Sequence, residues 1–134
     1  NNNKEANDPQ DWTYQLSQID YEISRLKWTR ESENNFINSL FGINDRNRIL
    51  SFYDIKLYLS ILKAIKNDNL DQAILESRKN LMKHSDRSLS QLNWDSEQAR
   101  EFLSTRMNEV TRSNLSLNQL YTFIRLLEEQ LNNK

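Results

Sequence analysis

The sequence of 134 residues contains no cysteine, one histidine, one glycine and one proline. The missing cysteine excludes disulfides, thiolate metal ligands and cysteine nucleophiles. A single histidine cannot supply the paired imidazoles of a zinc site, and one glycine cannot build a glycine-rich phosphate loop. We therefore expect neither a metal nor a cofactor.

The scarcity of glycine and proline also bears on the fold class. A β-rich chain needs turn residues about every 8–12 positions, and this sequence does not have them. Apolar residues instead recur at spacings of three and four, which is typical of amphipathic helices. We predict an all-α fold of about six helices.

Charge of one sign is not in excess, because 19 acidic residues face 18 basic ones and the formal net charge is −1. This balance argues against a protein that binds nucleic acid regardless of sequence, and against a basic membrane-surface protein. No apolar run approaches about 18 residues, and no segment resembles a signal peptide. We expect a soluble, cytoplasmic protein without membrane insertion.

Domain organisation follows from the length and from the polar N-terminus. We predict a disordered tail over residues 1–7 and a single helical domain over residues 8–134. The first helix is expected to start at Asp8 and Pro9, since these residue types suit the cap and the first helical position. A fourth helix is expected to end near Lys83, before a serine-rich connector over residues 84–91.

Capping residues mark most of the other helix ends. Thr29, Ser51, Asp95 and Ser116 each precede an apolar periodic stretch and are predicted as N-caps. Gly42 follows such a stretch and is predicted as a left-handed C-cap.

The third predicted helix, residues 52–66, is apolar almost all round. Such a helix is normally buried on more than one side. We favour cover by the first and sixth helices of the same chain, which predicts a monomer. The alternative is that Leu57, Tyr58 and Ile61 contact a foreign helix or a second copy in a homodimer.

Residues 26–65 and 92–131 resemble each other in sequence. The offset is 66, and it becomes 65 after one deletion. The matched pairs are Leu26 and Leu92, Trp28 and Trp94, Phe36 and Phe102, Arg46 and Arg112, Ser51 and Ser116, and Tyr58 and Phe123. This internal repeat predicts two tandem copies of one helical-hairpin unit.

The second copy also resembles a known module. Its stretch Leu92-Asn93-Trp94-Asp95-Ser96-Glu97-Gln98-Ala99-Arg100 is similar to a short helical module of cyanobacterial proteins. In that module a Leu-x-Trp-Thr-x-Glu-Gln-Gly-Arg segment precedes a Ser-Arg, a cap and a second helix. Some proteins that carry it act in DNA recombination, so the resemblance implies a helical fold and an accessory role with nucleic acid.

The repeated tryptophans, Trp28 and Trp94, have two interpretations. Each could fill the seam between the helices of its unit, with its indole N–H on a nearby carbonyl. Alternatively, both are anchors for a partner.

The repeated arginines, Arg46 and Arg112, lie in equivalent connectors. We expect each to pair with an acidic residue of its own unit, Glu31 or Glu97, or to cap a helix carbonyl. A phosphate contact shared by both arginines is the alternative.

No set of residues is typical of an active site. The carboxylates are spread along the predicted helices as the pairs Asp20/Glu22, Glu31/Glu33, Glu97/Glu101 and Glu128/Glu129. Of these four pairs, only Glu97 and Glu101 lie one turn apart. We therefore predict a non-enzymatic protein–protein interaction module or accessory subunit. The alternative is an accessory nucleic-acid-binding protein in DNA recombination or repair. The candidate binding residues are Trp28, Trp94, Arg46, Arg112, Leu57, Tyr58 and Ile61.

Overall fold

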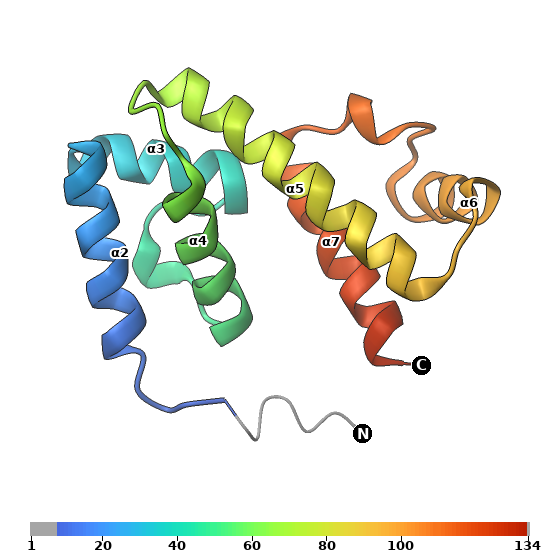
Figure 1. Ribbon diagram of the computed structural model, residues 1–134, viewed down its shortest axis with the longest axis horizontal. Coiled ribbons are helices and arrows are strands. Elements are labelled where there is room, and N and C mark those ends of the chain that lie inside the picture. Colours follow the sequence, from blue (N-terminus) through green and yellow to red (C-terminus); the bar gives the residue numbers. More distant parts are fainter. Residues whose placement is uncertain (1–7, 134) are drawn as a thin grey trace. The chain divides into compact units, whose positions relative to one another are not determined.

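The computed structural model describes residues 8–133, and within them every regular element is a helix (Figure 1). This confirms the predicted all-α fold. The predicted tail, residues 1–7, lies outside the described residues. The elements in chain order are α2 (Thr13–Leu26), α3 (Arg30–Phe41), the 3₁₀-helix η1 (Arg46–Arg48), α4 (Phe52–Ala64), α5 (Leu70–Leu92), α6 (Ser96–Met107), the 3₁₀-helix η2 (Arg112–Asn114) and α7 (Leu117–Asn132).

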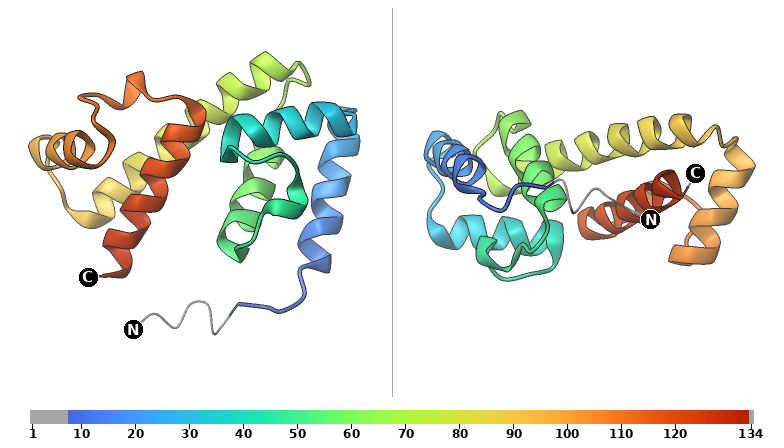
Figure 2. Two further views of the ribbon diagram at one scale, coloured as in Figure 1. Left: turned by 180° about the vertical axis from the view of Figure 1, so that it is seen from behind. Right: turned by 90° about the horizontal axis from the view of Figure 1, so that it is seen from below.

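The chain divides into two compact units. The first ends at Ser77 and the second begins at Arg78, so the boundary lies within α5. In the first unit α2 and α4 lie side by side, and α3 lies across them (Figure 1). In the second unit α6 follows the C-terminal end of α5, and the segment with η2 leads the chain to α7 (Figure 2). The single domain over residues 8–134 stays a prediction.

The four N-caps and the glycine C-cap predicted from the sequence are confirmed. The side chains of Thr29, Ser51, Asp95 and Ser116 each accept a hydrogen bond from the backbone N–H three residues later. At Asp95 and Ser116 a glutamine returns the bond, which completes a capping box. Gly42 ends α3 with φ 73°, the left-handed conformation that favours glycine. Local side-chain chemistry therefore decides where these helices start and stop.

The predicted start of the first helix is wrong. The structure begins α2 at Thr13, four residues after Pro9. The Asp11 carboxylate accepts the Thr13 backbone N–H at 2.9 Å, and the Trp12 indole donates to the Pro9 carbonyl at 3.1 Å. Residues 9–12 are held by these local bonds in place of a helical turn, and Trp12 stands at the N-cap position of α2 without a side-chain capping bond.

The predicted connector over residues 84–91 is also wrong, because α5 continues through it to Leu92. Ser85 and Ser88 are buried on the same helix face as Leu81, and all three lie on the interior side of α5. The Ser85 hydroxyl donates to the Met82 carbonyl at 2.8 Å, so the buried group is satisfied within the helix. Small serines thus continue an interior face that looks like a polar connector in the sequence.

His84 is therefore a half-buried helix residue and not part of a connector. Burial lowers the pKa of its imidazole, the positive charge of Arg87 lowers it further, and Glu128 opposes both. The unfolded chain then binds a proton near the ordinary pKa of about 6.5, whereas the folded chain binds it only at lower pH.

Stability is expected to fall as the pH drops from about 7 to about 5, because protons bind preferentially to the unfolded chain. Urea unfolding followed by circular dichroism at several pH values measures this loss. In His84→Gln the free energy of unfolding should change less with pH over the same interval. A parent and variant with identical pH profiles would contradict the assignment to His84.

The apolar third helix, α4, is buried as expected from its sequence. Tyr58 and Ile61 have no exposed surface and Leu57 is 6% exposed. In the first unit α2 packs along α4, which agrees with the part of the favoured interpretation that assigns cover to the first helix. The core of the second unit contains Leu103 and an apolar face of α7 formed by Leu117, Leu120, Phe123, Ile124 and Leu127.

No helix within residues 8–133 combines the length and the apolar character that crossing a membrane requires.

Candidate functional site

The two units share a turn before each repeated tryptophan. Lys27 and Asn93, 66 positions apart, both adopt the left-handed conformation, with φ 58° and 61°. Trp28 and Trp94 follow directly, and each donates its backbone N–H to a carbonyl of the preceding helix. The two carbonyls that accept these bonds, those of Ile23 and Leu89, precede the aligned stretches and are also 66 positions apart. The superposition of residues 26–65 on 92–131 stays a prediction.

The tryptophan rings have similar neighbours but different hydrogen bonding. Trp28 lies against Phe36 with ring centroids 5.1 Å apart, and Trp94 against Phe102 at 4.9 Å. The Trp28 indole N–H donates to the Asp68 carbonyl at 2.8 Å, as the seam interpretation predicts. The Trp94 indole N–H has no such acceptor among the described residues. Both side chains are half-buried.

In the first unit Arg46 is fully engaged by acidic side chains. Its Nε and Nη2 donate to the two oxygens of the Glu33 carboxylate at 2.9 and 3.0 Å, and its Nη1 donates to Asp20. The Tyr58 hydroxyl donates to the same Glu33 carboxylate at 2.8 Å. These bonds connect α2, α3 and α4 through Arg46, and the Glu33 carboxylate at their centre is buried.

The network shifts two pKa values. Burial raises the pKa of the Tyr58 phenol, and the charge of Glu33 raises it further, so the hydroxyl stays a donor. Burial alone lowers the pKa of Arg46, but the bonds to Glu33 and Asp20 outweigh it and leave that pKa raised. Arg46 is therefore a fixed cation within the first unit.

Arg112 of the second unit repeats only half of this pattern. Its Nη1 donates to Asp86 at 2.6 Å and to the Ser85 hydroxyl at 2.6 Å. Asp86 lies 66 positions after Asp20, as Arg112 lies 66 after Arg46, so this ion pair has its counterpart in the first unit. The Nε and Nη2 of Arg112 have no hydrogen-bond acceptor among the described residues.

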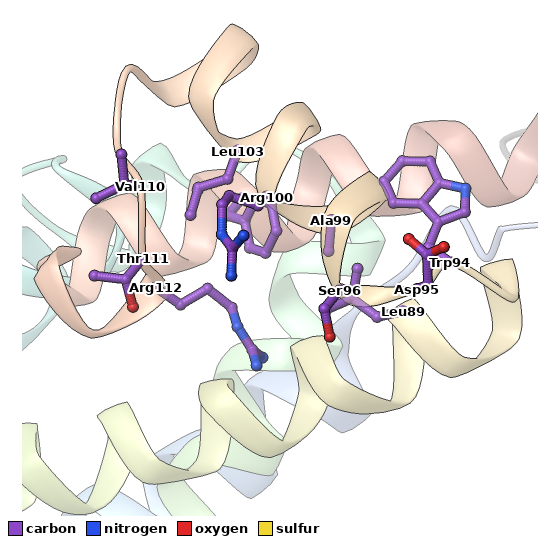
Figure 3. Close-up of a pocket in the computed structure, with 11 residues that line it drawn as sticks. Leu89, Trp94, Asp95, Ser96, Ala99, Arg100, Leu103, Val110, Thr111 and Arg112 are labelled. Carbon is purple, nitrogen blue, oxygen red and sulfur yellow. The ribbon is translucent and has the colours of Figure 1, made fainter.

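A cavity of about 240 Å³ lies beside these free donors (Figure 3). It is formed entirely within the second unit, by α5, α6, the connector with η2, and α7. Its lining residues are Leu89, Trp94, Asp95, Ser96, Ala99, Arg100, Leu103, Val110, Thr111, Arg112 and Phe123.

Two sequence differences between the aligned stretches fall at the lining of this space. Ala99 stands 66 positions after Glu33, so a methyl group replaces the carboxylate that binds Arg46 in the first unit. Phe123 occupies the position that matches Tyr58, and it lacks the hydroxyl that holds Glu33. The second unit therefore has an arginine at this position but no counterpart of the Glu33 carboxylate or the Tyr58 hydroxyl.

A second guanidinium group faces the same cavity. Figure 3 shows the Arg100 side chain extending from α6 toward Arg112. Arg100 is exposed and has no ion pair among the described residues. Asp95, the one carboxylate in the lining, accepts the Gln98 backbone N–H as the cap of α6. Val110 lies at the mouth of the cavity and is 66% exposed.

The predicted site residues separate into two groups. The cavity brings together Trp94 and Arg112, whereas Trp28 and Arg46 form internal contacts of the first unit. Leu57, Tyr58 and Ile61 are buried, so they form no exposed contact surface.

The acidic partners predicted for the arginines are wrong. Arg46 binds Glu33 and Asp20 where Glu31 was expected, and Arg112 binds Asp86 where Glu97 was expected. Glu31 and Glu97 lie in the first turns of α3 and α6, where they favour the helix N-terminus. The true partners come from an inward position of α3 and from the preceding helix.

Ala99, Arg100 and Val110 were missed by the sequence analysis. A signal for the first two exists in the repeat, which aligns Ala99 with Glu33 and Arg100 with Asn34. A position that changes from a carboxylate to a methyl group beside a retained arginine indicates a lost ion pair.

Comparisons with protein-family models, curated proteins and solved structures found no match to this chain. Within residues 8–133, no three side chains of histidine, cysteine, aspartate or glutamate are grouped so that they could hold a metal ion.

Proposed function

We propose that this protein is a non-enzymatic interaction module that binds a partner protein through the cavity of the second unit. The observation that carries the proposal is the composition of the cavity and its mouth. Trp94, Arg100, Arg112 and the exposed Val110 line one concave site. Aromatic and arginine side chains are enriched at the energetically dominant positions of protein interfaces.

The size of the cavity also favours a protein partner. Pockets for small-molecule ligands usually measure about 300–1,000 Å³, and this cavity measures about 240 Å³. A space of this size admits an inserted side chain. The flanking surface, including Val110, is then available to the rest of a bound segment.

The same residues argue against nucleic acid as the first choice. The net charge is −1, and Arg46, one of the two repeated arginines, is held by two carboxylates. Only Arg112 of that pair keeps donors that could reach a phosphate. The resemblance to the cyanobacterial module supports the nucleic-acid alternative, which the experiment below includes as an outcome.

Peptide selection tests the proposal without knowledge of the natural partner. Peptides selected from a displayed random library are expected to bind the parent protein and to lose binding to Val110→Asp. The matched control is Leu50→Asp, since Leu50 is an exposed aliphatic residue of the first unit, 85% exposed. Isothermal titration calorimetry with the selected peptides measures both variants.

Two results would overturn this function. One is a selection whose peptides bind both variants equally well, which would separate binding from the cavity. The other is a gel shift of DNA or RNA that weakens steeply as salt rises, because this dependence is the signature of phosphate contacts.

A further inference from the structure

From the comparison of the two units, we infer that the cavity accepts the carboxylate side chain of an aspartate or glutamate from the partner. This inference rests on the proposed function and adds the chemistry of the inserted group. The partner's carboxylate would occupy in the second unit the place that Glu33 occupies in the first.

The guanidinium donors of the two arginines carry the argument. In the first unit, Nε and Nη2 of Arg46 form a two-pronged contact with Glu33, while Nη1 holds Asp20. In the second unit, Nη1 of Arg112 holds Asp86, and its Nε and Nη2 have no acceptor among residues 8–133. The two donors of Arg112 without an acceptor therefore match the two donors with which Arg46 binds a carboxylate in the first unit.

The geometry of the site suits a planar anion. The N–H bonds of Nε and Nη2 in a guanidinium are parallel, so they can donate to the two oxygens of one carboxylate. Asp86 fixes Nη1, so the orientation of Arg112 is set before any ligand arrives. Preorganisation of this kind reduces the entropy lost on binding.

Arg100 adds a second positive charge that the first unit lacks. The matching residue there is Asn34. Two guanidinium groups directed into one space repel each other unless an anion lies between them. The Thr111 side chain also lines the cavity, and its hydroxyl is held by Ser113 as the N-cap of η2. The site is therefore complementary to one carboxylate.

The first experiment measures the affinity of a selected peptide by isothermal titration calorimetry. We expect the peptides to share one aspartate or glutamate, and replacement of that residue by its amide to weaken binding. Arg100→Gln should weaken binding about 10- to 100-fold, the range for loss of one charged hydrogen bond. Arg30→Gln, which removes the same charge from the exposed start of α3, is the control and should leave the affinity unchanged.

The second experiment returns the missing carboxylate to the chain. The glutamate of Ala99→Glu should enter the cavity and pair with Arg112, as Glu33 pairs with Arg46. The variant should therefore no longer bind the peptide. Its melting temperature should rise, whereas Ala99→Gln fills the same space without the charge and should not show this rise. Arg100→Gln keeps the inference testable if Ala99→Glu does not fold.

The outcomes separate the inference from the proposed function. Peptides that bind at the cavity without an acidic residue would overturn the inference and leave the proposed function standing. Glutarate binding at the cavity with no peptide binding at all would overturn both, since the carboxylate would then come from a small molecule. Acidic peptides whose affinity is unchanged by Arg100→Gln and Ala99→Glu would also overturn the inference.

Discussion

Replacement of Glu33 by alanine is expected to lower the free energy of unfolding by about 3–5 kcal/mol, the cost of breaking a buried ion pair on one side. Glu33 is 6% exposed and binds Nε and Nη2 of Arg46 together with the Tyr58 hydroxyl. Its removal leaves the part-buried guanidinium of Arg46 and the buried Tyr58 hydroxyl without this acceptor. Urea unfolding followed by circular dichroism measures the loss.

Asp20→Ala is the matched control, because Asp20 binds the same arginine from a position where 68% of its side chain is exposed. Exposed ion pairs contribute at most about 1 kcal/mol, so a small loss is expected there. Glu33→Gln keeps the volume and should fall between the two. If Glu33→Ala were no more costly than Asp20→Ala, the buried network would not stabilise the first unit.

Trp28→Ala is expected to have the second large effect, a loss at the lower end of the range of about 3–5 kcal/mol for buried aromatic truncations, since the ring is half-buried. The Trp28 ring packs on the fully buried Phe36, and its indole N–H satisfies the Asp68 carbonyl. The change removes apolar contacts and leaves this carbonyl without its donor. The same urea titration measures the loss.

Trp94→Ala supplies the comparison, since Trp94 packs on Phe102 at a similar distance, lacks the hydrogen bond and lines the cavity. Its stability loss should be smaller than that of Trp28→Ala by about 1 kcal/mol, the contribution of one hydrogen bond. It should also weaken peptide binding, whereas Trp28→Phe should not. Equal stability losses with unchanged binding would assign both rings to the core alone.

The positions of the candidate site residues could be predicted only in part. The repeat in the sequence identified Trp94 and Arg112, and the structure places both at the cavity. The partners of the arginines could not be predicted, because Glu31 and Glu33 lie only two residues apart and the sequence does not distinguish them. Only Glu33 faces inward from α3, and the helix rotation that decides this is set by packing.

The cavity itself is a property of the tertiary structure. Its lining comes from four segments, and its volume depends on how closely α5, α6 and α7 approach one another. The alanine at position 99 indicates a space beside Arg112 only once the contact between Glu33 and Arg46 in the first unit is known. No periodicity within a single helix contains that information.

The sequence by itself determined the elements whose signals are local. Thr29, Ser51, Asp95 and Ser116 cap helices because each side chain bonds a backbone N–H only three residues away. The late start of α2 follows a bond that is also local, from the Thr13 backbone N–H to Asp11. Packing decided the length of α5, which runs through residues 84–91 because Ser85 and Ser88 are small enough to be buried. A serine has the same local signal in a connector and in a tight helix contact, and only its neighbours in space distinguish the two.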